Sequence, residues 1–282
     1  MITLIILVAG LQVHEWGVIT QTPLSLSGAI PEIQPWENEL EDKAPVVYFH
    51  GDPCTVTVRI SFPGMGYASE VLPAPDEGGV NSTYILWNDL ELTESPGSGL
   101  TEGWRNQENL NFPIPVWRQV DALCIATSDR YDHFIYYECI PGRPGDLPFI
   151  SESGNHSFRM PYGEIPCVIL TSVDGIPMYG TFTLADIVTD IPKGLQFLDE
   201  PIQLRRELWQ WAEGVLNEDE FDSFWNTWES QFLSDSETDV MIIYRVPEEI
   251  LEQIATMEVI PDTQIEIDIN RFIIAELPYR TL

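Results

Sequence analysis

Apolar and polar residues alternate with a period of two over most of the first 190 positions. Pro, Gly, Asn and Asp interrupt this alternation every few residues, as they do in turns between short strands. Many short strands with such turns indicate antiparallel sheets packed face to face, a mostly β fold of the β-sandwich type. The strands predicted on this basis are 46–50, 55–62, 84–92, 116–127, 133–140, 167–173 and 178–184.

The pattern changes to a helical period after Pro192. A first helix is predicted to begin at Asp199-Glu200-Pro201, and a second at Asn217, where Asn217 and Glu220 resemble a capping box. An aromatic stripe at helical spacing follows Glu220 and is more typical of a core face than of a sugar-stacking face. Beyond the helix pair we expect a strand at 241–246, a short helix at 247–254 and a long final strand at 264–275. The stripe consists of Phe221, Phe224, Trp225, Trp228 and Phe232.

The chain therefore divides into a β-sandwich region, 12–190, and a C-terminal α+β subdomain, 191–282, with its helices and a final long strand. Before them, 1–11 is a candidate signal peptide, because Ile2–Leu11 is almost wholly apolar and Val8-Ala9-Gly10 offers small residues for cleavage. The alternative is one long buried strand over 2–20. No apolar run reaches the roughly 18 residues of a membrane-spanning helix, so no span is expected in the mature chain.

Charge narrows the classes of partner. The 282 residues include 45 acidic and 13 basic ones, a net charge of −32, and Lys43 and Lys193 are the only lysines. Such a field repels phosphate backbones and anionic headgroups, which argues against nucleic-acid binding and against membrane binding through a basic face. It favours a solvated acidic surface, with bound divalent cations as the alternative.

The four cysteines, Cys54, Cys124, Cys139 and Cys167, lack the Cys-x-x-Cys spacing of zinc ribbons and thioredoxin-like sites. All four lie on apolar segments, which fits small buried side chains as well as disulfides, and in an exported protein at least one disulfide is expected. Cys124 and Cys139 would lie close together on neighbouring strands of a hairpin turning near 129–132.

One segment stands out as a signature, His14-Glu15-Trp16-Gly17 with apolar strand formers on both sides. Together with 43–50, 56–63, 132–137 and 216–247, it resembles an uncharacterised family of secreted bacterial proteins with an N-terminal His-Glu-Trp-Gly-(Thr/Val)-Phe-Thr-like signature. Glu138 stands where that family's pattern has Arg. The resemblance implies export, and it carries over no catalytic residue.

Within the signature, His14 and Glu15 are adjacent on an expected strand and so point to opposite faces. Trp16 and Gly17 are interpreted as packing residues of a tightly packed strand. The side chains weighed as ligand or metal candidates are His14, Glu15, His50 and Glu138, with a hydrogen-bonded structural role as the alternative for His14.

The sequence contains no recognisable motif for a zinc site, an EF-hand, a catalytic nucleophile or a phosphate-binding loop. His50, His133 and His156 stand apart in sequence, and only their convergence in the fold would make a zinc site. The acidic segment 235–239 lacks the glycine and the final glutamate of an EF-hand loop. No nucleophile elbow or glycine-rich phosphate loop is present.

We therefore expect an exported acidic protein that acts as a binding or structural component of the cell envelope or extracellular space, with a protein or glycan partner. No cofactor is predicted, apart from the alternative of a divalent cation. The competing hypothesis is an extracellular hydrolase that uses carboxylates or a metal ion. The two differ in whether His14, His50 and Glu138 meet in one site.

Overall fold

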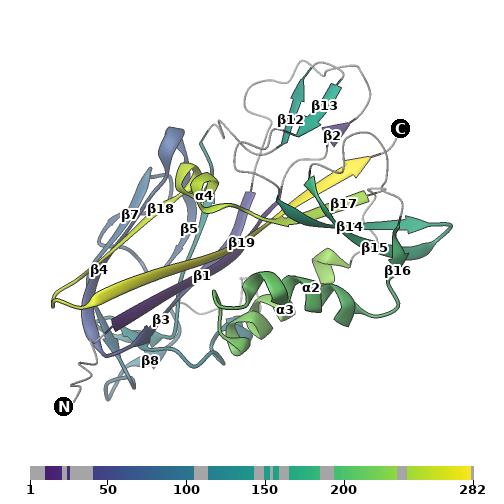
Figure 1. Cartoon of the computed structure of the whole chain (residues 1–282). Helices are drawn as coiled ribbons and strands as arrows, with labels where there is room; N and C mark the ends of the chain where they lie inside the picture. The colour runs from purple at the N-terminus through teal and green to yellow at the C-terminus, as the bar shows by residue number, and fades with distance from the viewer. Residues whose placement is uncertain are drawn as a thin grey trace, which may run out of the picture.

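The computed structural model describes residues 10–20, 24–25, 41–104, 114–142, 149–152, 155–158, 165–184, 194–233 and 240–280. Figure 1 shows two large twisted sheets and a pair of helices. The mostly β, sandwich-like fold class predicted from alternation is confirmed. The predicted signal peptide falls largely on 1–9, and the acidic segment 235–239 falls on 234–239; both stretches lie outside the described residues.

The larger sheet contains ten of the described strands. Its central strand is β1, Gly10–Thr20, which pairs parallel with β19, Glu266–Arg280, and antiparallel with β3, Glu41–Gly51. The order along the sheet is β16-β15-β14-β17-β19-β1-β3-β11-β5, and β2 pairs with β19. The other strands are β2 (Leu24–Ser25), β5 (Tyr67–Leu72), β11 (Ile135–Ile140), β14 (Pro166–Val173), β15 (Ile176–Thr183), β16 (Gln196–Phe197) and β17 (Val240–Arg245).

The smaller sheet has the order β18-β4-β7-β9-β10-β8, and β6 pairs with β7. A separate hairpin joins β12, Phe149–Glu152, to β13, Asn155–Phe158. The smaller sheet packs on one side of β1 and β19 (Figure 1). Its strands are β4 (Cys54–Ser61), β6 (Glu77–Gly78), β7 (Tyr84–Thr93), β8 (Thr101–Glu102), β9 (Cys124–Ala126), β10 (Arg130–Asp132) and β18 (Thr256–Pro261).

The opposite side of the larger sheet is covered by α2, Pro201–Ala212, and α3, Glu218–Phe232 (Figure 1). Both helices present apolar side chains inward, as their sequence pattern predicts. The capping box predicted for α3 is present, and α2 has one as well, between Glu200 and Gln203. Shorter helical segments are η1 (Pro63–Met65), α1 (Ile114–Trp117) and α4 (Glu248–Ile254). The layers are therefore sheet, sheet and helices, with β1 in the middle layer.

The sequence-based division at about 190 does not separate two sheets. The strands β17 and β19 come from the C-terminal third of the chain, yet β19 lies between β1 and β17 in the larger sheet. The middle layer is thus built from both ends of the described chain, and this brings α3 over β1.

Two sequence predictions are wrong around residue 120. The expected strand 116–127 is instead the short helix α1 followed, after an irregular stretch, by the three-residue strand β9. The turn at 127–130 joins β9 to β10 within the smaller sheet, and β11 then lies in the larger one. Cys124 and Cys139 are therefore on different sheets, and the expected disulfide between them is not formed.

Trp16 packs as the signature predicts. Its ring is fully buried and meets Trp117 and Phe224 edge-on, with centroids 5.9 and 5.8 Å away. A buried indole N–H usually finds a hydrogen-bond partner, but that of Trp16 has none among the described residues. Gly17 is buried beside a register shift between β1 and β3, where the bulged stretch of β3 lies opposite.

Candidate functional site

His14 and His50 lie side by side on the face of the larger sheet that the helices cover. In the antiparallel pair of β1 and β3, His14 is opposite Tyr48 and Gln12 is opposite His50. Residues two apart on a strand share a face, so the two histidines are diagonal neighbours on the same face. Their ring centroids are 4.9 Å apart.

Glu220, in the first turn of α3, joins the two histidines. His14 Nδ1 lies 2.8 Å from Glu220 Oε2, and His50 Nε2 lies 2.8 Å from Glu220 Oε1. Glu220 Oε2 also accepts a hydrogen bond of 2.7 Å from the backbone N–H of Asn217, which completes the capping box of α3. One carboxylate therefore caps a helix and binds two imidazoles.

The aromatic stripe of α3 fixes the height of Glu220 above the sheet. Phe221 and Phe224 contact Phe272 of β19, and Phe224 also contacts Trp16. These rings are fully buried, so the first turn of the helix is pinned where β1 carries His14. The same packing excludes water from Glu220, whose side chain has no exposed surface.

Electrostatics keep this buried carboxylate ionised. Burial by itself would raise the pKa of Glu220, but hydrogen bonds and charge interactions with His14 and His50 outweigh it and hold the pKa below its ordinary value. Burial raises the pKa of Tyr48 well above its ordinary value, so its hydroxyl stays protonated. That hydroxyl donates a hydrogen bond of 3.0 Å to the Trp117 carbonyl.

The three side chains form the group of possible metal ligands found among the described residues. One ligand atom from each of His14, His50 and Glu220 lies within 4.8 Å of the others. A tetrahedral ion with ligand distances of about 2.0–2.1 Å holds its ligand atoms about 3.3 Å apart. The present nitrogen-to-oxygen distances of 2.8 Å are those of hydrogen bonds to the two different oxygens of Glu220. To bind such an ion, the short pairs would widen by about half an ångström, and the more distant ligand atoms, which lie within 4.8 Å, would draw together to about 3.3 Å.

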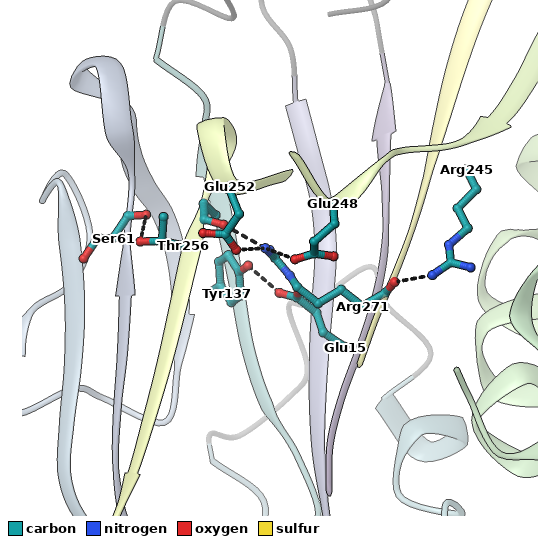
Figure 2. Close-up of polar contacts among 9 residues, drawn as sticks. Glu15, Ser61, Tyr137, Arg245, Glu248, Glu252, Thr256 and Arg271 are labelled. Atoms are coloured by element: carbon teal, nitrogen blue, oxygen red, sulfur yellow. Dashed lines mark hydrogen bonds and ion pairs between the residues drawn. The ribbon is translucent and has the colours of Figure 1, made fainter. Parts of the chain in front are cut away.

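Glu15 lies on the other face of β1, as strand alternation predicts. It pairs with Arg271, its direct neighbour on β19, and it accepts a hydrogen bond from Tyr137 (Figure 2). Arg271 Nη1 also donates 2.9 Å to the Ala255 carbonyl and lies within 3.5 Å of Glu248 and 3.4 Å of Glu252 on α4. Burial would lower the pKa of Arg271, but the charge of Glu15 outweighs it and raises that pKa.

The remaining sequence candidates lie elsewhere. Glu138 is on β11 opposite Glu70 of β5, and the register places it toward the Asp42 end of β3, far from His50. His133 lies beside Cys124 and 3.1 Å from the Ala122 carbonyl. The side chain of His156 is outside the described residues. The four sequence candidates thus separate into His14 with His50, Glu15 and Glu138.

Glu220 is the site residue that sequence reasoning missed. It was recognised only as the third residue of a capping box, a position that explains a glutamate without any ligand role. The signal that would have found it is the stripe that follows, because Phe221 and Phe224 show that this end of the helix is buried. A buried helix start with a glutamate needs a partner from the sheet below it.

Comparison with protein-family models, curated proteins and solved structures finds no match for this chain. Among the described residues, no helix is long and apolar enough to cross a membrane.

Proposed function

We propose that this protein is an exported binding protein for a divalent transition-metal ion, held by His14, His50 and Glu220. The observation that supports the proposal is the convergence of two imidazole nitrogens and one carboxylate, each from a different element, on one small volume. Two histidines and a glutamate are a ligand set that zinc uses in proteins.

The choice of partners for Glu220 favours ligand binding over a purely structural ion pair. A buried carboxylate that serves only the fold is best compensated by a permanent cation such as arginine. Glu220 has instead two imidazoles, whose ring nitrogens bind either a proton or a metal ion. When the ion binds, it replaces those protons as the positive charge facing the carboxylate.

The donor atoms also select the metal. Calcium and magnesium prefer oxygen ligands, whereas imidazole suits zinc, iron, copper and nickel. The set contains no thiolate, and the cluster is buried on the His14 side and slightly open at His50, whose side chain is 13% exposed. Zinc is the ion that these features support best, and the partly open side gives it a route into the cluster.

Titration of chelator-treated protein with zinc in a calorimeter tests the proposal. We expect one ion per chain, with affinity reduced at least about tenfold in each of His14→Ala, His50→Ala and Glu220→Gln. His133→Ala and Glu138→Gln are matched controls outside the cluster and should bind as the wild type does. Equal zinc affinity in the wild type and the three cluster variants would reject the site.

Export of the protein from the cytoplasm is a separate proposal. Export is supported by the apolar 2–11 stretch, by the acidic composition and by the resemblance to secreted proteins. Fusion of the first 20 residues to a reporter should carry it out of the cytoplasm of a bacterial host. Retention of the fusion in the cytoplasm would reject export without affecting the metal proposal.

A further inference from the structure

The cluster meets solvent on one side only. Among its three side chains, Glu220 is fully buried, His14 is 6% exposed and His50 is 13% exposed. The neighbour of His50 across the strand pair, Gln12, is exposed. Solvent therefore approaches the cluster from the His50 and Gln12 side.

On that side, the described part of the chain places no helix above the sheet. Gln12 and His14 share a face of β1, and their partners Asp268 and Asn270 on β19 continue this face. Gln12 and Asp268 are exposed, and Asn270 donates 3.1 Å to Asp268. Figure 1 shows the starts of β1 and β19 extending beyond α3. We call Gln12, Asp268 and Asn270 the rim.

Three protein ligands leave a tetrahedral ion one further position. Structural zinc sites are closed by four protein ligands, whereas catalytic sites use three and keep a water molecule in the fourth position. Among the described residues the cluster supplies three. Because Glu220 and His14 are buried and His50 is slightly exposed, a water molecule would reach an ion held here from the rim side.

From this geometry we infer a hydrolytic site for carboxylic esters or amides whose acyl part is neutral or positively charged; the inference rests on the metal-binding function proposed above. Zinc lowers the pKa of bound water to about 7, which provides hydroxide at neutral pH. The water oxygen bonds to the acyl carbon, and the bond from that carbon to the leaving oxygen or nitrogen breaks. One water proton goes to the leaving group and the other is released with the acid product.

The charge preference follows from the rim. Asp268 lies on the same face as His50 and two strands away from it, since Gln12 is paired with both, and the chain carries a net charge of −32. For charges about 10 Å apart, the spacing of two strands, in a largely aqueous medium, attraction of a cation and repulsion of an anion together favour the cationic substrate about fourfold at low salt.

The test uses the full chain loaded with zinc and three 4-nitrophenyl esters that share a leaving group: a neutral acetate, a trimethylammonium-bearing ester and a hemisuccinate. We expect zinc-dependent release of 4-nitrophenol, fastest for the cationic ester and slowest for the anionic one. Activity should vanish in His50→Ala and on treatment with a chelator, which tests the ion without any substitution. Circular dichroism checks that the variant is folded.

Asp268→Asn should keep zinc affinity while lowering the ratio of cationic to anionic rates at least about twofold. Asp174→Asn is the matched control. Asp174 is at the turn between β14 and β15, and its φ of 53° is one that asparagine also adopts. It should leave the ratio unchanged.

The outcomes separate the two proposals. Zinc binding at one ion per chain, with ester hydrolysis no faster than in His50→Ala, overturns the hydrolytic inference and leaves the metal-binding function intact. Failure to bind zinc overturns both. Hydrolysis of the anionic ester as fast as the cationic one overturns the substrate class.

Discussion

Two buried carboxylates lie on opposite sides of β1, and their negative charges are compensated by different kinds of partner. On the sandwich side, Glu15 pairs with Arg271 and Tyr137 (Figure 2). On the helix side, Glu220 faces His14 and His50. The first carboxylate has a permanent cation, whereas the second faces two imidazoles, the side chain that proteins use most often as a metal ligand. Burial alone therefore does not distinguish a structural site from a functional one; the chemistry of the partners does.

The Glu15 site also contacts more secondary-structure elements than the Glu220 cluster does. Arg271 reaches α4 through the Ala255 carbonyl and two glutamates, and α4 joins β17 of the larger sheet to β18 of the smaller one. The Glu15–Arg271 pair thus stabilises the segment in which the chain passes from the larger sheet to the smaller one. The Glu220 cluster fastens only the start of α3, so its loss is expected to cost less stability and more ligand binding.

The largest effect is expected for Arg271→Met. It leaves Glu15 buried without its cation and should lower the free energy of unfolding by about 3–5 kcal/mol, measured by urea denaturation. Arg205→Met is the matched control, since Arg205 and its partner Asp222 are both partly exposed and that pair contributes about 1 kcal/mol or less. A loss in Arg271→Met no greater than in Arg205→Met would contradict the structural role of the Glu15 site.

A smaller effect is expected for His14→Ala without metal. The loss of one buried hydrogen bond should lower the free energy of unfolding by about 1–3 kcal/mol. Added zinc should then stabilise the wild type, by about 4 kcal/mol when free zinc is a thousand times its Kd, and should leave the variant unchanged. Equal stabilisation of both proteins by zinc would place the ion elsewhere.

The smallest effect concerns pH. The pKa of Glu220 is lowered in the folded state, so its ionised form adds stability above the unfolded pKa, and this stability is lost as pH falls through the folded pKa. The difference in unfolding free energy between wild type and Glu220→Gln, measured without metal, should therefore shrink between about pH 6 and about pH 3. A difference that stays constant over that range would mean that the Glu220 carboxylate is not stabilised by its histidines.

The sequence predicted much of the fold, because alternation and capping are local signals. The strands β3, β4, β7, β14 and β17 and both long helices follow from them. The region around Cys124 was predicted wrongly because its apolar residues serve a short helix and a chain crossing between sheets, which local periodicity does not distinguish from a strand.

The candidate site was half predictable. His14 and His50 were named as candidates, and alternation separated His14 from Glu15 correctly. Their meeting depends on the register of β1 against β3, and the approach of Glu220 depends on how α3 packs across 206 residues of sequence separation. Those are properties of tertiary packing, which no local pattern encodes.

The most direct test of the metal proposal is anomalous X-ray scattering at the zinc edge from crystals of the zinc-treated protein. The account predicts one strong peak at about 2.0–2.2 Å from His14 Nδ1, His50 Nε2 and a Glu220 oxygen, with no peak beside Glu15 and Arg271. Crystals in which those three side chains keep their hydrogen bonds, with zinc absent or bound at another place, would contradict it.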